Sequence, residues 1–215
     1  MLSLISIILL SYLVGSFPTA ILVGRVVLKD DIRNFGSGNA GATNVFRVMG
    51  WKAGLFVFLI DVGKGALAPL VLAHLSLDAA LLPMPIVQII AGLAAIVGHI
   101  WTVFAEFKGG KGVGTAFGVL LGLAPVPALL AFAVWIILVA ITRIVSVGSI
   151  AAGVALPLSM LIQRHFSPYR IPNSLLIFGM IIGLLVVITH RANIKRLLRG
   201  EENKFGSSKS KKEQA

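Results

Sequence analysis

The stretch at residues 113–141, VGTAFGVLLGLAPVPALLAFAVWIILVAI, decides the predicted fold. It has no charged residue, but as one helix it would be about 43 Å long, against a hydrocarbon core of roughly 30 Å. Pro125 and Pro127 interrupt it near the middle, and a proline inside a helix removes a backbone hydrogen bond. We therefore predict two short helices that meet at these prolines.

The rest of the chain is also strongly apolar. Of its 215 residues, 57% are hydrophobic and 13% are charged, and the mean hydropathy is +0.97. A soluble domain of this length would not normally reach these values, so the sequence predicts an integral membrane protein. The other apolar spans are expected at residues 2–27, 53–75, 85–104, 150–162 and 175–189.

The basic residues lie between these spans and predict the topology. The formal net charge is +11, and the 19 Lys and Arg residues form no separate basic domain of the kind that binds nucleic acid. With the division at the prolines, all of them except Lys64, Arg164 and Arg170 fall on one side of the membrane. Because basic loops stay in the cytoplasm, we predict an all-α, polytopic membrane protein with seven transmembrane helices, two of them short. Its N-terminus is expected outside and its C-terminus in the cytoplasm, and a re-entrant hairpin is an alternative of the same parity.

The domain organisation is expected to be simple. Residues 1–202 are predicted to form a single transmembrane domain, and the Ser- and Lys-rich residues 203–215 a disordered, basic cytoplasmic tail. The chain has no cysteine, which excludes disulfide bonds and thiolate metal sites. The histidines form no cluster with metal-ligand spacing, and we expect no metal and no cofactor.

The run at residues 36–47, GSGNAGATNVFR, is the first candidate site. Its glycines allow successive backbone N–H groups to turn toward one anion, and its arginine adds a planar charged fork. A dinucleotide-binding loop is excluded, because no buried strand precedes the run. A flexible linker is the alternative, although this donor density exceeds what a linker needs. The candidate phosphate-binding residues are Ser37, Gly38, Asn39, Thr43, Asn44 and Arg47.

The run at residues 108–115, KGGKGVGT, is the second candidate site. It is not a nucleotide-binding P-loop, because Gly112 stands where that motif places Ser or Thr. Its position at the start of a helix favours anion binding, with basic topology anchors as the alternative. The candidate phosphate-binding residues are Lys108, Gly109, Gly110 and Lys111.

Three further residues are candidate catalytic residues, namely Ser149, His190 and Asn193. Ser149 is equally well explained as a helix N-cap. His190 and Asn193 share a helical face through their i, i+3 spacing, and a basic helix on the membrane surface is the alternative explanation.

Asp61 and Lys64 lie three residues apart inside a predicted span. An internal ion pair would allow both to survive at this depth, and we favour it over a proton path. His99 ends the third span, where a structural role is favoured over a catalytic one.

Taken together, these motifs resemble those of the bacterial acyl-phosphate:glycerol-3-phosphate acyltransferase family. The resemblance covers nearly the whole chain, from Gly15-Ser16 through the two glycine-rich runs and Gly98-His99 to the run HRANIKRLLRG at residues 190–200. Two positions depart from the family pattern. Thr102 stands where proline is common, and Gly114 where alanine is common.

The resemblance implies an enzyme of the cytoplasmic (inner) membrane with a seven-helix fold and its active site on the cytoplasmic side. It would transfer a fatty acyl group from acyl phosphate to the sn-1 hydroxyl of glycerol 3-phosphate, giving lysophosphatidic acid and inorganic phosphate. This is the first acylation step of phospholipid biosynthesis, and neither acyl-CoA nor acyl carrier protein is required. The active site would be lined by Ser37, Asn39, Arg47, Lys108, Lys111, Ser149, His190 and Asn193. From the residues alone, a transporter or channel for a phosphorylated solute is the alternative.

Overall fold

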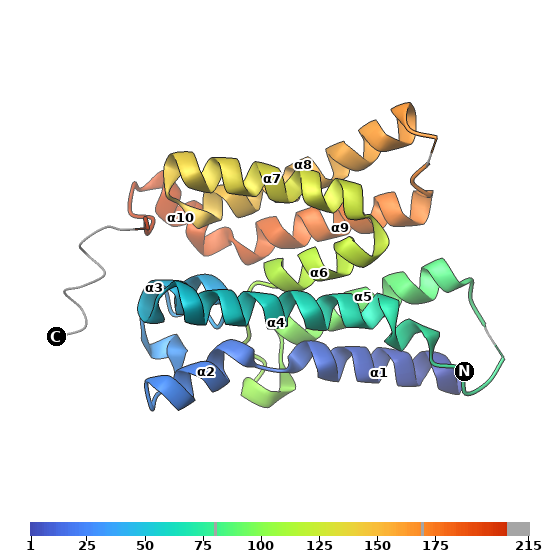
Figure 1. Cartoon of the computed structure of the whole chain (residues 1–215), viewed down its shortest axis with the longest axis horizontal. Coiled ribbons are helices and arrows are strands. Elements are labelled where there is room, and N and C mark those ends of the chain that lie inside the picture. Colours follow the sequence, from blue (N-terminus) through green and yellow to red (C-terminus); the bar gives the residue numbers. More distant parts are fainter. Residues whose placement is uncertain (80, 169, 206–215) are drawn as a thin grey trace. The chain divides into compact units, whose positions relative to one another are not determined.

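The computed structural model describes residues 1–79, 81–168 and 170–205, and every regular element among them is helical (Figure 1). Five spans in this part of the chain are long and apolar enough to cross a membrane, or six if the bent pair α9 (Asn173–Thr189) and α10 (Arg191–Leu198) is counted as one. The all-helical membrane fold is therefore confirmed, while the exact number of seven spans stays a prediction.

The chain divides into two compact units, Met1–Leu123 and Ala124–Ala215. The prediction of a single domain over residues 1–202 remains untested by this division.

The predicted break at the prolines is confirmed. Helix α6 (Val113–Leu123) ends just before Ala124, and α7 (Pro125–Thr142) begins with a proline at its first position. A proline there breaks no helical hydrogen bond, because the first N–H groups of a helix have no partner within it. The first helix is short, with 11 residues, as expected. The second has 18 residues and is itself a candidate span, so the expectation of two short helices was wrong for α7.

In the first unit, α1 (Leu2–Ser16) packs against α5 (Met84–Ile100). Glycines permit this close contact, because a side chain at Gly15 would collide with the backbone of Ala95, and one at Gly98 with Tyr12. Small residues are the usual means by which membrane helices approach each other. The span predicted at residues 2–27 contains a break at Phe17 and Pro18, after which α2 (Thr19–Val27) begins.

The other helices of this unit are joined by the same device. Helix α4 (Trp51–Leu70) packs against α6, with Gly65 at the backbone of Thr115 and Gly118 at the backbone of Val62. Helix α3 (Ala42–Met49) packs against the N-terminal part of α4, where Gly54 meets Phe46. Three short 3-10 helices complete the unit, at Ile32–Asn34, Leu72–His74 and Val103–Ala105.

The second unit contains α7, α8 (Val145–Phe166), α9 and α10 (Figure 1). Helix α8 packs against α7 and α9, and Gly153 lies against Gly183. It extends beyond the predicted span at 150–162 at both ends, and it begins directly after a tight turn in which Arg143 has a φ of 59°. Of the predicted tail, the Phe205 N–H donates to the Arg143 carbonyl at 2.9 Å, and residues 206–215 lie outside the described part of the chain.

Candidate functional site

The first glycine-rich loop is shaped from within by the side chain of Asn44. Its amide nitrogen donates to the carbonyls of Ile32 at 3.1 Å and Phe35 at 2.9 Å, and its amide oxygen accepts from the Ser37 N–H at 2.8 Å. Gly36 has a φ of 59°, a region that favours glycine, and any side chain there would collide with the Asn44 amide. Asn44 is fully buried. Its amide therefore organises the loop, which differs from the prediction that it faces an anion.

The other predicted residues of this loop are accessible. Gly38 is exposed, and Ser37, Asn39, Thr43 and Arg47 are half-buried. Thr43 lies in the first turn of α3, which begins at Ala42. Because the first N–H groups of a helix lack helical partners and carry positive partial charge, this end of the loop suits an anion.

The second glycine-rich loop packs closely against the end of α5. The N–H groups of Gly109 and Gly110 donate to the carbonyls of Ile100 at 3.0 Å and His99 at 3.1 Å. A side chain at Gly110 would collide with the His99 ring. Both N–H groups are thus engaged, which differs from the prediction that they point at an anion, and the two glycines serve close packing. Lys108 is exposed and Lys111 is half-buried.

The two loops come together in the first unit. Ala40 of the first loop and Gly109 and Gly110 of the second line one pocket. The same pocket is lined by residues from α1, α2, α4 and α5, and the hydroxyl of Ser16, which is fully buried, has no hydrogen-bond partner. The backbones of the two loops therefore meet at this pocket, and the phosphate-binding role of their side chains stays a prediction.

A buried ionic cluster forms part of the lining of this pocket. Lys64 Nζ is 2.8 Å from Asp61 Oδ1, which confirms the predicted ion pair. The same carboxylate oxygen accepts from the Thr19 hydroxyl at 3.3 Å and lies 3.6 Å from His99 Nδ1. Lys64 also donates to the Phe17 carbonyl at 2.9 Å, at the break between α1 and α2. The cluster therefore ties the break in the first span to α4 and α5.

Thr102, which departs from the resembled pattern, has a clear structural use. Its hydroxyl donates to the Ser16 carbonyl and accepts from the Phe104 N–H at 3.2 Å. It therefore fixes the chain after α5 to the end of α1, and it caps the short 3-10 helix that follows.

In the second unit, the structure excludes one of the two explanations of Ser149, and its catalytic role stays a prediction. The residue lies inside α8, one turn after the helix begins at Val145, so the N-cap alternative was wrong. Its buried hydroxyl accepts from Trp135 Nε1 at 3.2 Å.

His190 lies at the joint between α9 and α10 and is buried. Its Nδ1 donates to the Val186 carbonyl at 2.8 Å. This bond places the proton of the neutral ring on Nδ1 and leaves Nε2 as the acceptor nitrogen. Asn193, on the first turn of α10, is also buried.

Glu202 is the residue that the sequence interpretation missed. Its side chain is 6% exposed. Its carboxylate accepts from Asn193 Nδ2 at 2.6 Å, the Ser146 hydroxyl at 3.1 Å and Arg196 Nε at 2.7 Å. It therefore holds the predicted site residue Asn193 against α8. The available signal was an acidic residue at the end of a basic helix, which does not reveal a partner 56 residues away.

Metal binding finds no support in the described residues. No group of three or more His, Cys, Asp and Glu side chains among them is placed to hold a metal ion.

Comparison with known proteins gives a consistent result. Residues 5–200 match the family model described as glycerol-3-phosphate acyltransferase. A glycerol-3-phosphate acyltransferase of Chlorobaculum parvum is 46% identical over 226 residues, which cover 95% of this chain and 97% of the relative. One of Chlorobium luteolum is 43% identical over 239 residues, covering 98% and 100%.

Two crystal structures of the integral membrane glycerol 3-phosphate acyltransferase PlsY share the fold. The glycerol 3-phosphate form has a TM-score of 0.82 and 38% identity, and covers 95% of this chain and 96% of its own. The lysophosphatidic acid form has a TM-score of 0.79 and 37% identity, with the same coverage.

The buried ion pair gives a first testable prediction. Asp61→Asn and Lys64→Met each leave one charge buried without its counter-ion, which typically costs about 3–5 kcal/mol. We expect each single variant to lower the thermal midpoint of the detergent-solubilised protein markedly, and the double variant to regain most of the loss. Thermal unfolding followed by circular dichroism measures this. Additive losses in the double variant would show that the two side chains do not act as a pair.

Proposed function

This chain belongs to the glycerol-3-phosphate acyltransferase family, and we propose that its acyl donor is an acyl phosphate. It is an integral membrane acyltransferase of phospholipid biosynthesis. The acyl group would pass to the sn-1 hydroxyl of glycerol 3-phosphate, giving lysophosphatidic acid and inorganic phosphate. The bound forms of the related PlsY structures support this acceptor and this product.

The observation that carries the proposal is the meeting of two donor-rich loops in the first unit. Both proposed substrates carry a phosphate, and two phosphates held side by side repel each other strongly. Arg47, Lys108 and Lys111 offer positive charge. The side chains of Ser37, Asn39 and Thr43 offer uncharged donors, whereas the N–H groups of Ser37 and Gly38 donate to the protein itself. Such fixed charges and dipoles compensate the repulsion while they hold the reactants in contact.

The reaction needs little covalent help from the protein. An acyl phosphate is a mixed anhydride, so its phosphate is a good leaving group. The glycerol hydroxyl attacks the acyl carbonyl carbon, a new ester C–O bond forms, and the C–O bond to the phosphate breaks. We propose that a substrate phosphate oxygen takes the hydroxyl proton. Asp61 and His99 form a buried carboxylate–histidine pair at the pocket, with 3.6 Å between Oδ1 and Nδ1, but this carboxylate oxygen is already bound to Lys64.

Ser149, His190 and Asn193 are proposed to orient the reacting groups. All three side chains are buried and hydrogen-bonded within the second unit. The Val186 carbonyl fixes the tautomer of the His190 ring, and Glu202 holds the Asn193 amide. Each of these groups can therefore present a donor or an acceptor in one direction.

The placement of the charges supports the topology proposed for the enzyme. We propose seven membrane helices, with the short α6 counted among them. This topology would place the N-terminus outside and both glycine-rich loops at the cytoplasmic face of the bacterial inner membrane. The acyl chain then lies among the helices while the phosphates remain at the surface. We propose that residues 1–202 act as one domain and that neither acyl carrier protein nor acyl-CoA takes part.

Release of phosphate tests the function directly. Purified protein in lipid, supplied with synthetic acyl phosphate, is expected to release inorganic phosphate only when glycerol 3-phosphate is added. The Lys111→Ala variant should lose at least roughly tenfold in rate, because a charge-assisted hydrogen bond contributes about 1.5–3 kcal/mol. Lys52→Ala, which removes an exposed lysine outside both loops, serves as the matched control.

Two outcomes would contradict the proposal. Release that does not depend on glycerol 3-phosphate would exclude acyl transfer. Movement of glycerol 3-phosphate into sealed vesicles without consumption of acyl phosphate would indicate a transporter instead.

The pH dependence of the rate tests the role of His190. If His190 orients a group, His190→Ala should be strongly impaired, and the wild-type rate should show no single titration near the ordinary histidine pKa of about 6.5. A wild-type rate that follows such a titration, and that loses it in the variant, would instead identify His190 as the base.

A further inference from the structure

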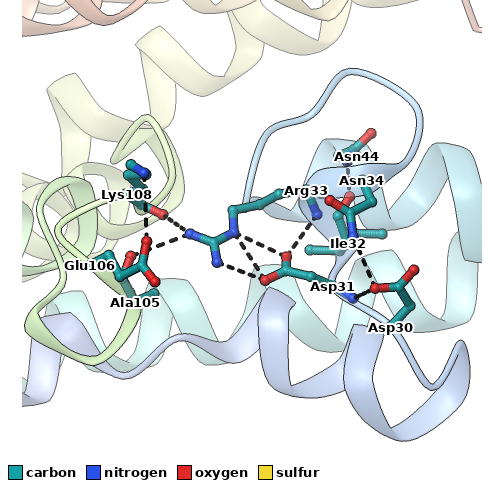
Figure 2. Close-up of polar contacts among 9 residues, drawn as sticks. All are labelled: Asp30, Asp31, Ile32, Arg33, Asn34, Asn44, Ala105, Glu106 and Lys108. Carbon is teal, nitrogen blue, oxygen red and sulfur yellow. Dashed lines mark hydrogen bonds and ion pairs between the residues drawn. The ribbon is translucent and has the colours of Figure 1, made fainter.

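Arg33 connects the two glycine-rich loops, which are far apart in the sequence (Figure 2). Its Nη1 donates to the carbonyls of Ala105 and Lys108, both at 3.3 Å, across separations of 72 and 75 residues. The other side of the guanidinium binds Asp31, with Nη2 at 2.7 Å from Oδ2 and Nε at 3.0 Å from Oδ1. One planar group thus holds a carboxylate on one side and two backbone carbonyls on the other.

The base of this connection is anchored in the first unit. The Asp31 carboxylate also accepts from the Arg33 N–H at 2.9 Å, which caps the 3-10 helix Ile32–Asn34. Ile32 is fully buried in an apolar cluster that includes Val45 of α3 and Val57 of α4. Its carbonyl accepts from Asn44, the residue that shapes the first loop. The segment that carries Arg33 is therefore held in fixed relation to the first loop.

The segment that Arg33 reaches has an unfavourable backbone conformation. Glu106 and Phe107, two successive residues other than glycine, have φ values of 57° and 58°. Such conformations persist when surrounding contacts enforce them. Arg33 binds the carbonyl of Ala105, which precedes the segment, and the carbonyl of Lys108, which follows it. Beyond Lys108, the N–H groups of Gly109 and Gly110 are bonded to the end of α5. The side-chain ion pair of Glu106 and Lys108 is exposed and contributes little.

We propose that Arg33 is a positioning residue that sets the separation of the two phosphate-binding loops, with Asp31 as its anchor. The proposal rests on the function proposed above, since it assigns both loops to phosphate binding. Arg33 itself is not required to touch a substrate. Its effect is to keep Lys108 and Lys111 at a fixed distance from Ser37, Asn39 and Arg47, so that two phosphates are held in reacting geometry.

The arrangement requires an arginine. A guanidinium carries five donors in a fixed plane, whereas a lysine ammonium cannot hold both oxygens of a carboxylate and two carbonyls in one plane. The hydrogen bonds with Arg33 lower the pKa of Asp31, and those with Asp31 raise the pKa of Arg33. The pair is therefore charged at neutral pH, and its stabilisation is lost only as the pH falls through the lowered pKa of Asp31.

Hydrogen–deuterium exchange of the purified protein tests the effect on the loop without any substrate. In Arg33→Ala and Arg33→Lys, we expect amides in residues 103–110 to exchange roughly tenfold faster, as for the loss of hydrogen bonds of about 1 kcal/mol each. Peptides from α4, in the same unit as Arg33, and from α8 should exchange at the wild-type rate, which shows that the variants are folded. Arg170→Ala, an exposed arginine in the other unit, is the matched control.

Kinetics on the same samples complete the test. We expect kcat per folded molecule to fall roughly tenfold or more in both Arg33 variants, because misplaced reactants react slowly even when bound. Asp31→Asn, which keeps one acceptor oxygen, should lie between them and the wild type. A purely structural role would reduce the amount of folded enzyme and leave kcat per folded molecule unchanged.

Two results would overturn the positioning role of Arg33. Loop exchange that is unchanged in Arg33→Ala, or full recovery of both exchange and kcat in Arg33→Lys, would show that the planar fork does not position the loop. Failure of the proposed function is distinguishable, because it would appear as an inactive wild-type protein while the exchange measurement still reports on Arg33.

Discussion

The ion pair of Asp61 and Lys64 is the interaction on which the first unit depends. Two charges buried within a membrane-spanning segment require partners, and each finds them on other elements. Asp61 faces Thr19 at the start of α2 and His99 at the end of α5, and Lys64 binds the Phe17 carbonyl where the first span breaks. The pair therefore joins α2, α4 and α5 at the pocket where the two glycine-rich loops meet.

From this base, the loops are ordered by buried polar side chains rather than by their glycines alone. The His99 carbonyl and ring support Gly110, the Asn44 amide supports the turn at Gly36, and Arg33 joins the two loops. Glycine allows the close approach, and the side chain beneath it defines the direction. As a result, the charged side chains that are proposed to bind phosphates are carried by a backbone with few alternative conformations.

Much of this arrangement was predictable from the sequence, because the relevant signals are local. Proline and span length predicted the division before Pro125, and i, i+3 spacing predicted the pair of Asp61 and Lys64. The break at Phe17 was not predicted, since tertiary structure brings the Lys64 side chain that binds the Phe17 carbonyl. The start of α8 at Val145 was not predicted either, because the turn before it places Arg143 at a φ of 59°, which residues other than glycine rarely adopt.

The site shows the same limit. The donor-rich runs were recognised from composition, but the use of each donor was not. The Asn44 amide and the Gly109 and Gly110 N–H groups bind the protein itself, and Glu202 and Arg33 act across 56 and more than 70 residues. No sequence pattern encodes such contacts, because they depend on how helices that are distant in the chain pack together.

The central claim is that the two loops lie at one face of the membrane and bind phosphate together. Since the chain has no cysteine, single cysteines at Ser37 and at Lys108 can be labelled with a membrane-impermeant maleimide in oriented vesicles. The account predicts that both react only from the cytoplasmic side and that glycerol 3-phosphate slows both reactions. Reaction of either position from the outside, or protection of neither by glycerol 3-phosphate, would contradict it.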